Sequence, residues 1–94
     1  MSTAIAVLST CDSRQQADDI AHQLVAENLA ACVQIDSVDS VYRWQGEVES
    51  GPEYRLLIKT TAACYEGVEA LIHKAHDYAV PQVLQLDILS LIHI

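Results

Sequence analysis

The segment AIAVLSTCDSRQQADDIAHQLVAENLAACVQI, residues 4–35, decides the fold. It opens with the continuous apolar run Ala4–Leu8, which is typical of a strand buried on both faces. A polar stretch follows, in which Ser13 and Gln16 have the spacing of a capping box at a helix start. The predicted helix ends near residues 28–30, and its apolar residues share one face: Ala17, Ile20, Ala21, Leu24 and Val25. A second strand-like run, Ala31–Ile35, completes a strand–helix–strand order.

The next part of the chain predicts a long hairpin. Strand-like residues continue from Ala31–Ile35 to Trp44, and the phase of the apolar positions slips near Asp36 and Ser37. Such a slip predicts a bulge or bend there. Gly46 allows a turn, and residues 49–52, Glu-Ser-Gly-Pro, also have turn composition. A returning strand is predicted over residues 53–60.

A second helix and a last strand complete the predicted order. Thr60 or Thr61 can cap this helix, which ends by Pro81 because the residue before a proline avoids helical geometry. Its predicted apolar face consists of Tyr65, Val68, Leu71, Ile72 and Ala75. Residues 82–88 predict the final strand. The order β-α-β-β-α-β predicts an α+β, ferredoxin-like domain over residues 1–94, an antiparallel four-stranded sheet with both helices on one face.

Composition favours an oligomer and disfavours several partners. The chain has 94 residues and a formal charge of −8, yet 51% of its residues are hydrophobic. A domain of this size buries only about 60–65% of its unfolded surface, so the uncovered sheet face predicts self-association. The negative charge disfavours nucleic acids and anionic membranes. The sequence shows no apolar segment long enough to span a membrane and no basic leader before the first apolar run. Its three cysteines are widely spaced, unlike those of a disulfide framework. Together these features predict a cytoplasmic protein.

Four motifs together resemble one protein family. They are Leu29-Ala-Ala-Cys-Val33, Ser40-Val-Tyr-Arg-Trp-Gln-Gly46, Ile58-Lys-Thr60 and His76-Asp-Tyr-Ala-Val-Pro81. In this order and spacing, over about residues 4–86, the chain closely resembles the CutA divalent-cation tolerance family. The resemblance implies a ferredoxin-like fold, a compact trimer like that of the PII signalling proteins, and a long hairpin packed between subunits.

The chain departs from the family pattern at two places. Family members commonly have His-Pro-Tyr, where this chain has His76, Asp77 and Tyr78. They also usually continue past the fourth strand into a Gly-containing loop and a C-terminal helix with a Tyr-Leu-x-Trp element. Residues 87–94 of this chain, DILSLIHI, do not match that pattern, which implies that the family's C-terminal helix is absent.

Two histidines near the end of the second helix are candidate metal ligands. His73 and His76 are three positions apart, so they lie on neighbouring parts of a helix face and their imidazoles could approach one ion, copper(II) being favoured by intrinsic affinity. The resemblance adds that His76 matches a family histidine implicated in copper binding. The alternative is that His73 is an ordinary solvated residue and that His76 caps the helix C-terminus.

Cys11 is the third candidate ligand. The predicted first strand ends at Leu8, so Cys11 is expected in the loop that opens the first helix, where a thiol has a lowered pKa and is a soft ligand suited to copper. Family members often carry a cysteine implicated in copper binding two positions earlier, where this chain has Ser9. The alternative is an ordinary loop residue. Cys32 and Cys64 are interpreted as small packing residues.

Tyr42 and Trp44 lie near the predicted hairpin tip. An isolated hairpin cannot bury two such side chains, so a place in a subunit interface is favoured over stacking on a ligand.

The leading functional prediction is a trimeric, cytoplasmic, non-enzymatic protein that binds copper or another divalent transition metal and serves metal tolerance. The alternatives are a PII-like signalling trimer that binds a small ligand between subunits, and a purely structural or interaction trimer. An acylphosphatase-like enzyme needs an arginine in the loop after the first strand, and residues 9–13 contain none. The sequence also has no Gly-rich phosphate loop, HExxH motif or Ser-His-Asp order.

Overall fold

The computed structural model describes residues 3–76 and 81–88, and it confirms the predicted fold. In this part of the chain the elements are β1 (Ala4–Cys11), α1 (Arg14–Ala26), β2 (Cys32–Trp44), β3 (Glu47–Thr61), a 3-10 turn (Ala62–Cys64), α2 (Tyr65–Ala75) and β4 (Leu84–Asp87). Asp77 and Tyr78 lie outside the described residues, as does the segment after residue 88 where the family's C-terminal helix is predicted to be absent.

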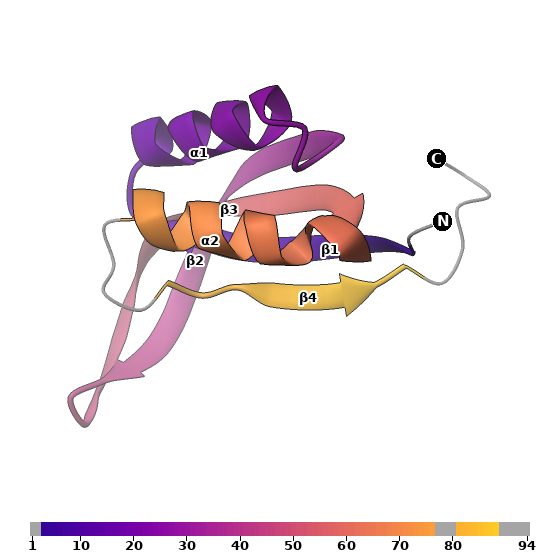
Figure 1. The fold of residues 1–94 in the computed structure, drawn as a ribbon. Coiled ribbons are helices and arrows are strands. Elements are labelled where there is room, and N and C mark those ends of the chain that lie inside the picture. Colours follow the sequence, from indigo (N-terminus) through magenta and orange to yellow (C-terminus); the bar gives the residue numbers. More distant parts are fainter. Residues whose placement is uncertain (1–2, 77–80, 89–94) are drawn as a thin grey trace.

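The four strands form one antiparallel sheet in the order β2-β3-β1-β4, and both helices cover the same face (Figure 1). Burial along β1 alternates strictly. The residues of β1 that face the helices are Ile5, Val7, Ser9 and Cys11. The predicted burial of this strand on both faces was wrong because no element of the described chain covers the far side of the sheet.

The core lies between the helices and the two central strands. Ile20 and Leu24 of α1 meet Leu56 and Ile58 of β3, and all four are fully buried. From α2 come Val68, Leu71 and Ile72, as the apolar spacing predicted. Val25, predicted on the buried face of α1, is instead 44% exposed because it lies at the rim of that face.

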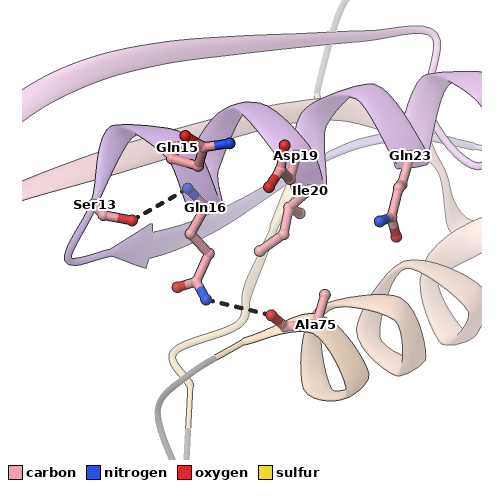
Figure 2. Close-up of a pocket in the computed structure, with 7 residues that line it drawn as sticks. All are labelled: Ser13, Gln15, Gln16, Asp19, Ile20, Gln23 and Ala75. Carbon is pink, nitrogen blue, oxygen red and sulfur yellow. Dashed lines mark hydrogen bonds between the residues drawn. The ribbon is translucent and has the colours of Figure 1, made fainter.

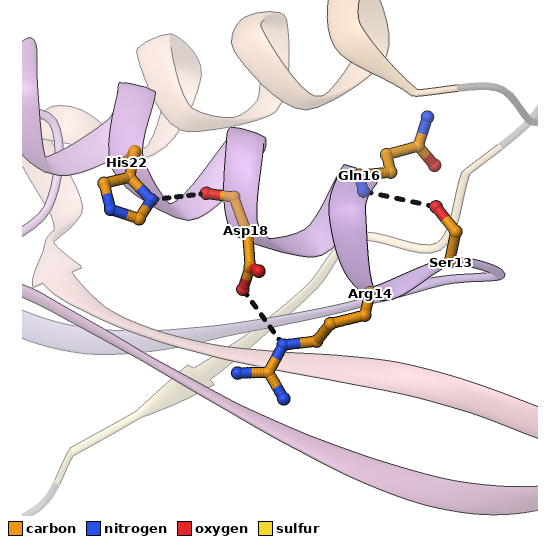
Figure 3. Close-up of polar contacts among 5 residues, drawn as sticks. All are labelled: Ser13, Arg14, Gln16, Asp18 and His22. Carbon is orange, nitrogen blue, oxygen red and sulfur yellow. Dashed lines mark hydrogen bonds and ion pairs between the residues drawn. The ribbon is translucent and has the colours of Figure 1, made fainter.

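The Ser13 side chain caps the start of α1 as predicted, but the Gln16 side chain does not return a hydrogen bond to Ser13. The Ser13 hydroxyl oxygen accepts a hydrogen bond of 3.2 Å from the backbone N–H of Gln16 (Figure 3). In a complete capping box the Gln16 side chain would return to Ser13. Here its amide instead donates to the carbonyl oxygen of Ala75, at 3.3 Å, and so joins α1 to the end of α2.

The hairpin turns at Gly46 as predicted, but the second predicted turn, at residues 49–52, does not form. Its turn consists of Gln45 and Gly46, with φ values of 50° and 83°, the pattern of a type I′ turn. Residues 49–52 are therefore not a turn but part of β3. Pro52 is accommodated because it lies beyond Tyr54, where the pairing of β3 with β1 ends and one edge of the strand is open.

No bulge occurs near residues 36–37. The pairing of β2 with β3 runs without interruption from Cys32 opposite Lys59 to Trp44 opposite Glu47. The slip in apolar phase arises because the outer half of the hairpin projects beyond the helices (Figure 1), so neither of its faces is buried in this chain.

The second helix also starts later than predicted. Thr61 makes no side-chain cap, and the short turn Ala62–Cys64 intervenes before Tyr65. The Thr60 hydroxyl donates instead to the carbonyl oxygen of Leu29, at 2.6 Å, which holds the loop after α1 against β3.

Candidate functional site

The predicted metal ligands lie where the end of β1, the start of α1 and the end of α2 meet. Figure 2 shows Gln16 reaching across this junction to Ala75. Beside it lies a cavity of about 420 Å³, lined by Ser13, Gln15, Gln16, Asp19, Ile20, Gln23 and Ala75. Its lining offers mainly amide and hydroxyl groups and one carboxylate. This set lacks the imidazole and thiolate donors that copper and zinc prefer.

His76 is the C-cap residue of α2 and is 9% exposed. Its backbone N–H donates to the carbonyl oxygen of Ile72, at 2.9 Å. Its ring Nε2 is bonded to the carbonyl oxygen of Thr10, and because a carbonyl only accepts, Nε2 carries the proton. A protonated ring nitrogen has no lone pair for a metal. The geometry of His76 is therefore that of the capping alternative, and coordination through Nε2 would require this bond to break.

Cys11 lies in a strand, which corrects its predicted place in a loop. β1 extends to Cys11 because residues 9–11 continue the pairing with β3, and Cys11 stands opposite Tyr54. Its side chain faces the helices and is fully buried. Cys11 is thus outside helix α1 and away from solvent, so it does not have the exposed position at a helix N-terminus that is typical of reactive, metal-binding thiols.

Ser9 shares the buried face of β1 with Cys11. It is fully buried, and its hydroxyl has no hydrogen-bond partner among residues 3–76 and 81–88. A buried hydroxyl without a partner keeps its desolvation cost.

Replacing Ser9 with alanine should therefore raise the free energy of unfolding by about 1 kcal/mol, because the substitution removes that uncompensated cost. Chemical denaturation at fixed protein concentration measures the change. Ser37→Ala, at an exposed position of β2, is the control and should leave stability unchanged. Destabilisation by Ser9→Ala would show that the hydroxyl has a stabilising partner.

His73 lies in the last turn of α2 and is exposed. Across residues 3–76 and 81–88, no three His, Cys, Asp or Glu side chains gather closely enough to hold a metal ion. Glu69, one turn before His73, accepts a hydrogen bond of 3.0 Å from the Tyr65 hydroxyl. This bond raises the pKa of Tyr65, with smaller contributions from burial and from the negative charge of Glu69.

A larger groove lies between the outer half of the hairpin and the end of β1. Its volume is about 900 Å³, and its lining residues are Thr10, Asp12, Ser40, Val41, Tyr42, Trp44, Gly51, Pro52, Glu53 and Gln82. The sequence singled out Tyr42 and Trp44. Asp12, Glu53 and Gln82 were missed because only the hairpin register and the bend of the strands bring them to the same groove.

The sheet face opposite the helices is apolar along its centre. Leu8 of β1 stands directly opposite Leu57 of β3 on one side and Leu84 of β4 on the other. Leu84 and Leu86 are 46% and 50% exposed. Cys32, interpreted as a packing residue, is also exposed because it starts the edge strand β2. We call the surface formed by Ala6, Leu8, Leu57, Leu84 and Leu86 the open apolar face.

None of the helices in the described ranges is both long enough and apolar enough to span a bilayer.

Comparison with known proteins agrees with this fold. The sequence model of the family described as "CutA1 divalent ion tolerance protein" matches residues 5–92. "Divalent-cation tolerance protein CutA" of Thermus thermophilus is 43% identical over 83 residues, which cover 87% of this chain and 81% of the relative. "Protein CutA, chloroplastic" of Arabidopsis thaliana is 38% identical, and the match covers 90% of this chain but 47% of that protein.

A solved structure shows the same likeness in three dimensions. The "Periplasmic divalent cation tolerance protein CutA" from Archaeoglobus fulgidus superimposes with a TM-score of 0.92 at 27% identity, covering 96% of this chain and 88% of the other. From the fold, the motifs and these matches, the chain belongs to the CutA1 divalent ion tolerance family.

Proposed function

We propose that this chain forms a homotrimer that binds copper or another divalent transition metal and serves metal tolerance in the cytoplasm, without catalysing a reaction. The observation that carries the proposal is membership of a family whose proteins are named for divalent-cation tolerance. The cytoplasmic assignment rests on the sequence argument alone, since relatives are named as chloroplastic and periplasmic proteins.

The open apolar face supports the oligomer. Leu8, Leu57 and Leu84 form a continuous apolar row across three strands, and such a surface favours burial against another copy. Tyr42 and Trp44 project from the same face further along the hairpin, beyond the Arg55–Asp36 ion pair, at 48% and 60% exposure. We assign both residues to the interface between subunits.

The metal site is proposed to lie between subunits. The described residues of one protomer do not bring three suitable donors together, and we propose that a second copy supplies further ligands. His73 is exposed and can contribute without rearrangement. His76 and Cys11 are buried, so their participation requires the end of α2 to move away from β1.

Calorimetric titration of copper(II) and zinc(II) tests this proposal. Loss of a true ligand should weaken binding at least about tenfold, the size of effect known for residues that support metal sites. The variants are His73→Ala, His76→Ala and Cys11→Ser. His22→Ala is the matched control, because His22 is an exposed histidine on α1 whose Nδ1–H donates to the Asp18 carbonyl oxygen at 2.8 Å (Figure 3).

Which of the three variants lose metal affinity decides between the candidate ligands. Weakening by His73→Ala alone would restrict the site to the surface of α2. Equal binding by all three variants and the control would contradict the proposed ligands, and no binding by the unaltered protein would contradict metal binding itself. Each variant is first checked for its melting temperature, because His76 and Cys11 are buried.

Binding of a small ligand, as in a PII-like signalling trimer, is the second candidate function. The groove of about 900 Å³ favours it, because ligand sites are commonly concave and of roughly 300–1,000 Å³. The high negative charge of the chain disfavours nucleic acids and anionic membranes as partners of either function.

A further inference from the structure

An ion pair borders the open apolar face. Arg55 of β3 stands directly opposite Asp36 of β2, and it projects to the same side of the sheet as Leu57, two positions further along. The Arg55 guanidinium donates to both carboxylate oxygens of Asp36, from Nη2 at 2.8 Å and from Nε at 3.3 Å. A contact through two such bonds fixes the orientation of both side chains.

The pair lies between the two surfaces that are assigned to the subunit interface. The open apolar face begins on one side of it, at Leu57. On the other side, further along the hairpin, Tyr42 and Trp44 project from the same face. A second copy that packs over both surfaces also covers the ion pair between them, and it removes water from the two charges.

Burial changes what this ion pair contributes. An exposed pair adds little to stability because water screens both charges. Once water is excluded, each charge depends on the other, and loss of one partner leaves an uncompensated charge in the interface. Arg55 has five N–H donors, and Asp36 engages two of them. A covering surface that is apolar at this point is therefore disfavoured, whereas one that is apolar beside it, at Leu57, is favoured.

We propose that the Arg55–Asp36 pair is buried between subunits and determines the register in which the copies associate. A copy shifted along the sheet would place apolar side chains against the two charges, which would lose their water without compensation. The inference rests on the proposed trimer and deepens it, because it names the residues that select one arrangement. It does not depend on metal binding.

The chain contains a similar ion pair outside this surface. Arg14 and Asp18 lie one turn apart on α1, with Nε and Oδ1 separated by 3.0 Å (Figure 3). Their side chains are 58% and 44% exposed, close to the 46% and 52% of Arg55 and Asp36. Helix α1 covers the opposite side of the sheet (Figure 1). The two pairs are thus similarly exposed in one protomer, and assembly is expected to distinguish them.

Variants that remove one charge test the burial of the pair. Asp36→Asn and Arg55→Gln should each raise the concentration at which half of the protein is assembled by at least about tenfold, because the remaining charge is buried without its partner. The matched controls Asp18→Asn and Arg14→Gln should leave this concentration unchanged. Analytical ultracentrifugation over a dilution series measures it. Chemical denaturation of the separated subunits should give nearly equal stability for all four variants, which excludes a folding defect.

A double variant tests the register separately. Asp36→Leu combined with Arg55→Leu removes both charges, so no unpaired charge is left and the protein should still associate. Without the polar element the apolar surface can pack in more than one way. Native mass spectrometry is expected to show several oligomeric masses for this variant and one mass for the unaltered protein.

Two results would overturn the inference alone. Equal assembly of Asp36→Asn and Asp18→Asn would mean that the pair stays exposed in the trimer. A single trimer mass from the double variant would mean that the apolar residues fix the register without the pair. In both cases the unaltered protein is still a trimer. A monomeric unaltered protein would instead contradict the proposed trimer, and this inference with it.

Discussion

Replacing Leu57 with glutamate is expected to convert the proposed trimer into a monomer. Leu57 lies in the middle of the open apolar face, directly opposite Leu8. A carboxylate at this position would have to lose its water inside an apolar interface, which costs several kcal/mol per subunit and exceeds what one subunit contact supplies. The helix-facing core is untouched, so the monomer should keep its secondary structure. Size-exclusion chromatography with light scattering should show the mass fall to about a third of the trimer mass.

Val25→Glu is the control for this change. Val25 is 44% exposed on α1, on the opposite side of the sheet from Leu57, so its substitution adds the same charge outside the proposed interface. The mass of this variant should equal that of the unaltered protein. If the Leu57→Glu variant kept the full mass, or if the unaltered protein were already a monomer, the proposed interface would be incorrect.

The second large effect is expected from Ile58→Ala, which should lower the free energy of unfolding by about 3–4 kcal/mol. Ile58 is fully buried in the central strand β3 and belongs to the core cluster that includes residues of both helices. Truncating it removes apolar contacts and leaves a cavity that the packed helices cannot close completely. Chemical denaturation at a fixed protein concentration measures the loss.

Leu57→Ala is the matched comparison, since the neighbouring residue projects to the other face of the same strand. At protein concentrations low enough to separate the subunits, Leu57→Ala should lower the free energy of unfolding much less than Ile58→Ala, because that face is then open to water. At high concentration its cost should grow, because stability is coupled to assembly. A similar and concentration-independent cost at both positions would contradict the difference between the two faces.

Most of the fold was predictable because it depends on local patterns. The Ser13 cap, the helical spacing of Ile20 and Leu24, and the apolar spacing of Val68 and Ile72 each predicted an element that the structure contains. The errors arose where burial depends on distant parts of the chain. The outer hairpin has no regular apolar phase because nothing in this chain covers it, and that irregularity was misinterpreted as a bulge.

The candidate site was less predictable than the fold. His76 was correctly expected at the end of α2, whereas Cys11 was expected in a loop and lies in β1. The burial of both residues and the bond from His76 to Thr10 depend on how three elements pack together. The spacing of residues along the sequence does not show how these three elements pack against one another. The acidic residues of the groove escaped notice for the same reason, since Asp12 and Glu53 are distant in sequence and become neighbours only through the sheet.

The two-residue turn at Gln45 and Gly46 also has a consequence for the order of folding. β2 and β3 pair along their whole shared length from this turn, so each new pair closes only a small additional loop. We expect this hairpin to form within microseconds, before the rest of the sheet. β1 must wait for a far larger loop to close, because its partners β3 and β4 come from much later in the chain. The hairpin that reaches furthest from the folded body is therefore the segment around which that body is built.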